Sequence, residues 1–288
     1  MSSSTTSSAG LAAHAASQSV PSPPFIQVDG IPNFRDIGGY PITEASSTRR
    51  NFIFRSGLPT RVTANGVKTL TQDLKVDTIY DLRSNAELRK DPASALLTSM
   101  EGVKVLHTPV FPEKDISPAQ LANRYACYMS DKGTEGFVAA YSEILRDGTD
   151  AYKTIFEHVR DHPDKPFLVH CTGGKDRTGV VIALLLLVAG VKSWDVVAEE
   201  YALTEIAFDA KIRAVFVEKV VADMGVDTDR AGVLRMISAR KENMIATLEF
   251  IEGEYGGPEE YVKKALGFED HDIEIIRKNL TVEEKGIF

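Results

Sequence analysis

Residues 170 to 179 read HCTGGKDRTG, and this stretch gathers the side chains best suited to chemistry. Cys171 and Arg177 stand six positions apart, with a glycine pair, a lysine and an aspartate between them. The stretch follows PFLV, which has the pattern of a buried strand, and leads into VVIALLLLVAG, which has the pattern of a buried helix. A polar, glycine-bearing turn between two such elements is where α/β proteins place their chemistry.

Phosphate transfer to sulfur would use every residue type in this turn. A helix N-terminus offers unpaired N–H groups and a partial positive charge, which stabilise a thiolate on Cys171 and cradle a phosphate dianion. Gly173 and Gly174 would let the backbone adopt positive φ, so that successive amides point inward. Arg177 would supply a planar fork for two phosphate oxygens and for the charge of the transition state. Thr178 is expected to place its hydroxyl near the sulfur and to cap the helix.

The other residues of the turn are predicted to contact the substrate or to support the loop. Thr172, Lys175 and Gly179 are expected on the phosphate side, together with the glycine pair and Thr178. His170 is expected to brace the loop through its ring nitrogens rather than to act as a base.

Other kinds of site fit this stretch less well. A Walker A loop needs a glycine five positions before the Gly-Lys pair and Ser or Thr after it, where Val169 and Asp176 stand. A zinc site on His170 and Cys171 lacks further Cys or His ligands at useful spacing. A buried cysteine and a surface ion pair would explain either key residue alone, but not their crowding at one helix N-terminus.

The C-x5-R loop in the form HCTGGKDRTG resembles the tyrosine-phosphatase family that includes the secreted tyrosine/lipid phosphatases of mycobacteria and Listeria and fungal tyrosine/serine phosphatases. Residues 27 to 280 carry further similar blocks: NFRDIGGY (33–40), FRSGLPT (54–60), DLRSNAELRKDP (81–92), AEEYALT (198–204) and YGGPEEYVKKALGF (255–268). The resemblance implies an α/β fold with a mostly parallel central sheet flanked by helices and a C-terminal helical cap. It also implies a phosphomonoester hydrolase with a cysteinyl-phosphate intermediate, which needs no metal and no cofactor.

Two other classes of function remain alternatives. A phosphate-binding adaptor on the same fold would usually have lost the nucleophile or the arginine, and both Cys171 and Arg177 are intact. A rhodanese-like sulfur transferase also has a cysteine in a strand-loop-helix turn, but it does not combine the NFRD and GKDRTG blocks. The hydrolase is therefore favoured over both.

The upstream blocks admit simple structural interpretations. Arg35 could pair with Asp36 and fix the following glycine turn, and Arg83 could form a surface i,i+4 pair with Glu87. Asp81 differs because it ends the apolar run VDTIYDL, where ligand-facing groups lie in open parallel sheets. It is expected to line the site or to orient the arginine of the loop.

The proton donor for the leaving oxygen is not settled by the motif. Tyrosine phosphatases of the receptor and cytosolic type use an aspartate in a Trp-Pro-Asp loop, and no such tripeptide occurs here. Asp176 is the first candidate, because myotubularin-like lipid phosphatases carry an aspartate at the corresponding place that resembles a general acid. Asp115 is the second candidate and Asp81 the third, and each could instead be structural.

Lys175 bears on the substrate. A second cation beside Arg177 would add binding for a further phosphate group, as on a phosphoinositide, and lipid-acting members of the family share the Gly-Lys pair. The alternative is a lysine that offsets the charge of Asp176. Phosphotyrosine, phosphoserine and phosphoinositide substrates all remain open.

Composition limits the partners and the compartment. The chain has 288 residues with 33 basic and 41 acidic side chains, a net charge of −8, which argues against general affinity for nucleic acid or anionic membrane. Two cysteines, Cys127 and Cys171, are too few for a disulfide framework and favour a reducing compartment, the cytoplasm or the nucleus. The longest apolar run, 180–189, is about half of the ~20 residues that span a bilayer, so no transmembrane segment is expected.

The pattern of elements predicts a single domain. Residues 1–24 contain eight serines and no Asp, Glu, Lys or Arg, which is typical of a disordered tail. From residue 25 to 288 we expect one phosphatase domain, with strands at FIQV near 25, FIF near 52, VDTIYDL from 76, VKVLHTPV from 103 and FLVH from 167.

After residue 178 the pattern is helical, with no further strand expected. Helices are predicted at 178–190, 193–203, 206–222 and about 241–255, with two short helices after them. Residues 206–238 are expected to form either a lid over the site or ordinary core. Cys127, in RYACYM, is expected to be a dispensable core residue on a helix.

Overall fold

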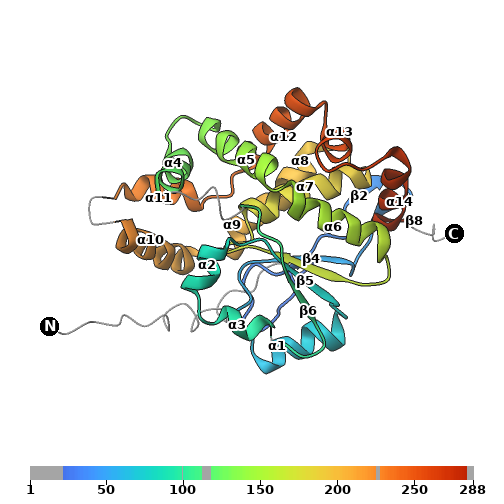
Figure 1. Ribbon diagram of the computed structural model, residues 1–288, viewed down its shortest axis with the longest axis horizontal. Helices are drawn as coiled ribbons and strands as arrows, with labels where there is room; N and C mark the ends of the chain where they lie inside the picture. The colour runs from blue at the N-terminus through green and yellow to red at the C-terminus, as the bar shows by residue number, and fades with distance from the viewer. Residues whose placement is uncertain (1–21, 99, 112–117, 225–227, 284–288) are drawn as a thin grey trace.

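The computed structural model describes residues 22–98, 100–111, 118–224 and 228–283. Its centre is a five-stranded sheet in the order β1-β4-β7-β5-β6. The bounds of these strands are β1 Arg35–Asp36, β4 Ile53–Ser56, β5 Thr78–Asp81, β6 Lys104–His107 and β7 Phe167–His170. The four strands from β4 to β6 run parallel, and β1 is antiparallel to β4 at one edge. The mostly parallel sheet flanked by helices is confirmed (Figure 1).

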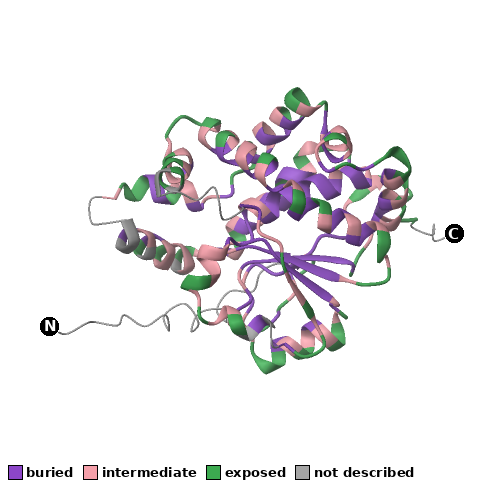
Figure 2. Cartoon of the chain, in the orientation of Figure 1, coloured by how far each residue is buried: buried purple, intermediate pink, exposed green. Residues whose placement is uncertain are grey.

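Both faces of this sheet are covered, because successive side chains of its central strands point alternately into two apolar cores. In β7, Phe167 and Val169 belong to one core and Leu168 to the other, and β5 divides Tyr80 and Ile79 in the same way. Strands covered on both faces read as continuous apolar runs, which is why the sequence marked them clearly. Figure 2 shows the central strands β4, β5 and β7 in the colour of buried residues, whereas the edge strand β6 is only partly buried.

Helices cover the sheet on two sides (Figure 1). The smaller core lies under α1 Ala64–Lys68, the π-helix η2 Thr69–Asp73 and α3 Ser94–Thr98, whereas α2 Asn85–Lys90, between β5 and α3, contributes no residue to it. The larger core lies under the long helices of the other face: α5 Glu135–Asp147, α6 Thr149–Asp161, α7 Asp176–Ala189, α8 Trp194–Ala202 and α12 Lys241–Tyr255. Helix α7 is apolar on nearly all sides and runs through the middle of this core (Figure 2).

Two predictions about strands are wrong. The run FIQV does not form a strand of the sheet, since Phe25 makes only a single bridge to Arg35 while Val28 turns into the smaller core. Strands also do not stop at residue 178, because β8 Thr281–Glu283 closes a second, antiparallel sheet with β2 Pro41–Thr43 and β3 Ser46–Thr48. Short strands of two or three residues carry too little periodicity to stand out in a sequence.

The helical part after α7 follows the prediction in outline, with α13 Pro258–Lys264 and α14 Asp270–Leu280 as the two short helices. The expected helix 206–222 is divided at Phe208 into α9 Thr204–Ala207 and α10 Ala210–Met224. Helix α11 Arg230–Ile237 was not predicted as a separate element. Cys127, in α4 Pro118–Met129, is half-buried at the edge of the larger core, and its dispensability stays a prediction.

Helices α10 and α11 form a small core of their own with α4, at one end of the molecule (Figure 1). Val217 and Val221 of α10 pack there against Val233 and Ile237 of α11. The segment 206–238, predicted as a lid or as ordinary core, therefore packs partly on itself and partly against α4. Its action as a lid stays a prediction. In the described ranges, no helix combines the length and the apolar character needed to cross a membrane.

Candidate active site

The turn between β7 and α7 lies at the carboxyl edge of the sheet. Ser56 at the end of β4 and Asp81 at the end of β5 are both paired in register with His170 at the end of β7. Parallel strands thus bring three segments that are far apart in sequence to one edge, where open α/β sheets bind ligands. The loop from Cys171 to Lys175 begins there and ends at the first turn of α7.

Four consecutive carbonyl oxygens of this loop accept hydrogen bonds from groups behind it. The pairs are His170 Nδ1 with Cys171 at 3.2 Å, Leu58 N with Thr172 at 3.1 Å, Asn33 Nδ2 with Gly173 at 3.1 Å and Arg55 Nη2 with Gly174 at 2.5 Å. In a planar trans peptide the N–H points away from the C=O. The N–H groups of residues 172–175 therefore face the opposite side, where they form a cradle for an anion.

A buried cluster of charges supports the back of the loop. Glu200 accepts from Arg35 at 2.7 Å and from Arg55 at 2.5 Å, and Asn33 joins the cluster through its side-chain oxygen. Both guanidinium groups are fully buried, so two cations share one carboxylate out of contact with water. Burial, followed by the charge of Arg55, lowers the pKa of Arg35 to about 10. Burial alone would raise the pKa of Glu200, but the two arginines outweigh it and hold that pKa below its usual range.

The expected pair of Arg35 with Asp36 is wrong. Neighbouring residues of a strand point to opposite faces, so the two side chains cannot meet. Asp36 instead accepts hydrogen bonds from the backbone N–H groups of Gly38 at 2.9 Å and Asn51 at 3.0 Å. It does fix the glycine turn, as expected, but without the arginine.

The two glycines of the loop have different roles. Gly174 has a φ of 65°, and a Cβ there would lie 2.1 Å from the carbonyl oxygen of Ser56. Gly173 does not have positive φ, contrary to the prediction, and a Cβ there would meet the Phe208 ring at an ordinary 3.7 Å. Of the two loop positions, only 174 requires glycine, because the chain there has positive φ and lies against the end of β4.

Cys171, directly after β7, and Thr178, in the first turn of α7, are both buried. The hydroxyl oxygen of Thr178 has no hydrogen-bond partner among the described residues, which leaves it available to a neighbouring acceptor. The prediction that Thr178 caps the helix is wrong, because the N-cap is Lys175 and no side chain caps it. Gly179 lies further along α7 against the Tyr201 ring, and its N–H bonds to the carbonyl of Lys175, so the structure does not bring it into the cradle.

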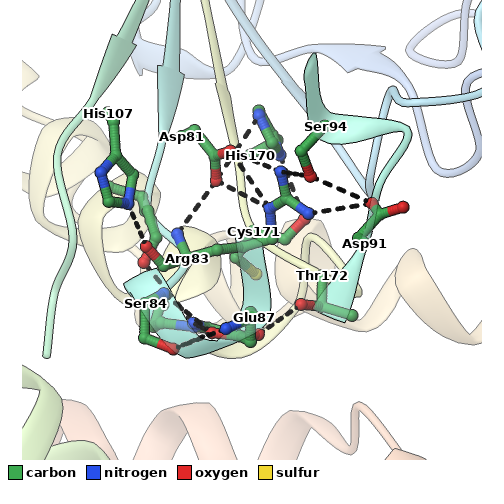
Figure 3. A network of polar contacts seen from close by, with 12 residues as sticks. Asp81, Arg83, Ser84, Glu87, Asp91, Ser94, His107, His170, Cys171 and Thr172 are labelled. Carbon is green, nitrogen blue, oxygen red and sulfur yellow. Dashed lines mark hydrogen bonds and ion pairs between the residues drawn. The ribbon is translucent and has the colours of Figure 1, made fainter. Parts of the chain in front are cut away.

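Arg177 is held at the loop by a carboxylate that the sequence did not single out. Its two terminal nitrogens donate to Glu87 at 2.6 and 2.9 Å, and the hydroxyl of Thr172 donates to the same carboxylate at 2.6 Å. Burial would raise the pKa of Glu87, but Arg177 outweighs it and holds the pKa far below its usual range. Glu87 also closes a capping box with Ser84 at the start of α2 (Figure 3).

The expected surface pair of Arg83 with Glu87 is wrong for a simple reason. Helix α2 begins at Asn85, so Arg83 lies before the helix and the i,i+4 spacing does not bring the two side chains together. The S-x-x-E spacing of Ser84 and Glu87 was visible in the sequence, and it was the signal that places Glu87 in the first helical turn. No local signal showed that Glu87 reaches Arg177.

Asp81 takes part in a second network beside the loop (Figure 3). Its carboxylate accepts three contacts from Arg83, at 3.0, 3.1 and 2.7 Å, and lies 3.8 Å from Nε2 of His170. Burial favours the protonated form of Asp81, but these hydrogen bonds outweigh it and keep its pKa below the usual value. Arg177 does not appear among its described contacts and no hydrogen bond joins Asp81 to His170, so the expected role of Asp81 at the site stays a prediction.

His170 contacts the loop as a neutral imidazole. It is fully buried, and this burial lowers its pKa. A carbonyl can only accept, so the ring proton lies on Nδ1, which faces the carbonyl oxygen of Cys171 at 3.2 Å. Nε2 has no hydrogen-bond partner among the described residues, so the bracing of the loop through both ring nitrogens stays a prediction.

Asp176 and Lys175 form a close ion pair at the mouth of α7. The ammonium of Lys175 lies 2.5 Å from Oδ1 of Asp176 and also over the ring of Phe137, 4.9 Å from its centroid. Burial alone would lower the pKa of Lys175, but the carboxylate outweighs it and raises that pKa. Two roles were considered for Lys175, and these contacts agree with the one in which its charge offsets that of Asp176. Its role as a second phosphate-binding cation stays a prediction.

The three candidate proton donors differ in their surroundings. Asp176 belongs to the loop and its side chain is 26% exposed, whereas Asp81 is buried in its contacts with Arg83. Asp115 lies outside the described residues. Within the described ranges, no three His, Cys, Asp or Glu side chains are grouped closely enough to hold a metal ion.

Sequence comparison gives a family match and several similar proteins. A sequence model described as the tyrosine phosphatase family matches residues 26–282. A protein of Cupriavidus necator, provisionally named as a tyrosine-protein phosphatase, is 26% identical over 89% of this chain and 91% of its own length. The triple specificity protein phosphatase PtpB of Mycobacterium tuberculosis is 28% identical over 61% of this chain and 67% of its own length.

A solved structure is also similar. The core catalytic domain of the PP-IP phosphatase Siw14 from S. cerevisiae, in complex with citrate, covers 65% of this chain and 91% of its own. The two are 16% identical with a TM-score of 0.34.

The contrast between the two loop glycines is directly testable. Gly174→Ala should destroy the cradle, because its Cβ would clash with the Ser56 carbonyl at a φ that alanine rarely adopts. Gly173→Ala should keep it, since its Cβ meets only ordinary contacts. We expect tungstate binding by calorimetry to fall at least about tenfold in the first variant and less than about threefold in the second. Equal losses in both variants would contradict this account of the loop.

The pair of Glu87 with Arg177 should depend on pH in a defined direction. The pKa of Glu87 is lowered in the folded protein, so the stability it contributes is present above its ordinary value of about 4.3 and is lost as the pH falls further. The melting temperature of Glu87→Gln should therefore lie below that of wild type by a constant amount from pH 7 to 5. The difference should shrink below about pH 4.

Glu218→Gln is the matched control, because Glu218 makes an exposed ion pair with Arg230 and its loss should change the melting temperature little at any pH. A difference between wild type and Glu87→Gln that stayed constant down to pH 3 would show that Glu87 contributes nothing through its charge.

Proposed function

The chain belongs to the tyrosine phosphatase family and is a phosphatase, and from this premise we propose that it hydrolyses phosphate monoesters through a cysteinyl-phosphate intermediate. The observation that carries the proposal is the loop itself. The N–H groups of residues 172–175 lie opposite the four bonded carbonyls, and Arg177 is close enough to Cys171 for the charge of a thiolate there to raise the pKa of the guanidinium. A dianion is the ligand that such a set of donors selects.

In the first step the Cys171 thiolate attacks the phosphorus of the bound ester. A sulfur–phosphorus bond forms and the phosphorus–oxygen ester bond breaks, and its electron pair passes to the leaving oxygen. The cradle amides and Arg177 bond to the three non-bridging oxygens, whose charge they stabilise most strongly in the transition state. All of this chemistry is supplied by the side chains and backbone of the protein, so the proposed mechanism uses no metal and no cofactor.

Glu87 prepares Arg177 for this task. It binds both terminal nitrogens of the guanidinium and so fixes the plane of the fork before substrate arrives. Thr172 adds a third hydrogen bond to the same carboxylate and ties it to the loop. Preorganisation of this kind lowers the cost of ordering Arg177 during the reaction.

Asp176 is the proposed proton donor to the leaving oxygen. It stands in the loop, one residue before Arg177, and its side chain is partly exposed. Asp81 is a poorer donor, because its contacts with Arg83 favour the ionised form and cover both of its oxygens.

In the second step water attacks the phosphorus of the intermediate, and the Asp176 carboxylate takes the proton of that water as the sulfur–phosphorus bond breaks.

We propose phosphorylated proteins as the substrates, with phosphotyrosine to be tested first, and phosphoserine and phosphoinositides after it. The relatives named above are called tyrosine-protein and triple specificity protein phosphatases. The charge of Lys175 is engaged by Asp176, which weakens the case for a second phosphate group on the substrate.

The nucleophile and the arginine can be tested together. Cys171→Ser should abolish phosphate release from an activated aryl phosphate in EDTA, because an alcohol is a far weaker nucleophile than a thiolate, yet it should still bind tungstate. Arg177→Ala should lose about 10²-fold or more in turnover together with tungstate binding. Cys127→Ser is the control and should keep full turnover. A wild-type protein that binds tungstate but releases no phosphate would be the adaptor of the alternative hypothesis.

The role of Asp176 can be tested by changing the leaving group. Asp176→Asn should lower kcat by ~10²–10⁴ with phosphotyrosine, whose leaving oxygen needs a proton, and by much less with an activated aryl phosphate. The asparagine keeps the shape and most hydrogen bonds of the aspartate, so the loop should remain intact. An equal loss with both substrates would mean that Asp176 only shapes the loop, and the same comparison on Asp115→Asn and Asp81→Asn would then locate the donor.

A further inference from the structure

Two buried tyrosines reach the loop at Asp176. The hydroxyl of Tyr141, in α5, donates to Oδ1 of Asp176 at 2.8 Å. The hydroxyl of Tyr201, in α8, lies 2.7 Å from that of Tyr141. Both residues are almost completely buried, and neither was singled out by the sequence. Packing alone would not require their hydroxyl groups, and these lie in a hydrogen-bonded chain that ends at Asp176.

The direction of this hydrogen-bond chain follows from counting protons. A tyrosine hydroxyl has one hydrogen to donate. Tyr141 uses its hydrogen on the carboxylate, so Tyr201 must be the donor in the contact between the two hydroxyls. The chain therefore runs from Tyr201 to Tyr141 to Asp176, and each donated bond strengthens the next.

The chain also fixes which oxygen of Asp176 can carry a proton. Oδ1 accepts from Tyr141 at 2.8 Å and from Lys175 at 2.5 Å. Within the described residues no hydrogen bond reaches Oδ2, and the side chain is 26% exposed. An oxygen that already accepts two donated hydrogens is the poorer place for a third, so protonated Asp176 carries its hydrogen on Oδ2.

We propose that Tyr141 is the positioning residue of the proton donor, holding Oδ1 of Asp176 so that the protonated Oδ2 faces the leaving oxygen. This inference rests on the proposed function, in which the ester bond breaks and Asp176 gives its hydrogen to the departing oxygen. Tyr141 itself gains and loses no proton in the reaction.

The chemistry of Tyr141 suits this role. Burial, followed by the negative charge of Asp176, raises the pKa of Tyr141 well above its ordinary value. The hydroxyl is therefore neutral throughout the working range of the enzyme and always offers its hydrogen to Asp176. A histidine or lysine in its place would change its charge or add a second one beside Lys175.

The alternative is that Tyr141 serves only the packing of an aromatic cluster. Its ring lies edge-on to those of Phe137 and Tyr201, with centroids 5.8 and 6.4 Å apart. A phenylalanine would keep these contacts and lose only the hydroxyl. Tyr141→Phe would, however, leave the buried hydroxyl of Tyr201 without its acceptor, which costs stability and could be mistaken for a loss of function.

A set of three variants separates the two explanations. Tyr141→Phe removes the bond to Asp176 and orphans Tyr201, Tyr201→Phe keeps the bond to Asp176, and the double variant removes both hydroxyls so that neither is orphaned. For each variant, kcat is measured with phosphotyrosine and with an activated aryl phosphate, and the melting temperature is recorded. The ratio of the two kcat values reports proton donation.

If Tyr141 positions Asp176, Tyr141→Phe and the double variant should both lose about tenfold or more with phosphotyrosine and less than about threefold with the activated ester. Tyr201→Phe should change the ratio by less than about threefold. If Tyr141 serves only packing, the double variant should instead return to the kcat ratio of the wild type. That result would overturn the proposal. If Tyr141→Phe does not fold, the double variant alone decides between these outcomes.

The same assays in an Asp176→Asn background distinguish failure of this inference from failure of the proposed function. Tyr141→Phe should add no further change in the kcat ratio once the acid is gone, because the two residues act on one step. A ratio that responds to Asp176→Asn but not to Tyr141→Phe would overturn only the role of Tyr141. A ratio that responds to neither would overturn both roles, while the tests on Cys171 and Arg177 would still stand.

Discussion

Donors behind the loop hold four backbone carbonyls away from the phosphate side, and the rest of the site depends on these hydrogen bonds. One of the donors is Arg55, a fully buried guanidinium that shares Glu200 with Arg35. Burying charges in this way costs desolvation free energy that apolar residues of similar volume would not. We infer that the cluster serves the loop. The Gly174 carbonyl accepts a hydrogen bond from the charged Arg55, which polarises this peptide group and makes its N–H, on the cradle side, a stronger donor.

The side chains around the cradle are also held in place before any ligand binds. Arg177 is fixed by Glu87, whose helix is in turn tied to the end of β5 because Arg83 contacts both Asp81 and Asp91 (Figure 3). Asp176 is fixed by Tyr141 and Lys175 on the other side. Each functional group is thus restrained by a partner from a different element, so little ordering is left to be done during the reaction.

These restraints concentrate cations at one place in an acidic protein. The chain carries a net charge of −8, yet the groups within reach of the loop include the cations of Arg35, Arg55, Lys175 and Arg177 against the carboxylates of Glu87, Asp176 and Glu200. The network beside the loop adds Arg83 and the carboxylates of Asp81 and Asp91, so five cations meet five carboxylates there and the net charge of the site is not what would select an anion. The remaining surface has no need of positive charge, because recognition occurs at a specific cradle and not by general attraction.

The sequence by itself determined the strand, the loop and the helix around Cys171 and Arg177, because these are encoded within a few adjacent residues. A buried strand and a buried helix have distinct apolar patterns, and a loop of fixed length between them leaves little freedom in its geometry. Only the tertiary structure decided the partners of the charged side chains. Arg35 meets Glu200 across 165 positions and Arg177 meets Glu87 across 90, whereas the sequence-local pairings of Arg35 with Asp36 and Arg83 with Glu87 fail. Side chains pair by proximity in space, and a strand sends neighbouring residues to opposite faces, so adjacency in sequence could not choose among the carboxylates.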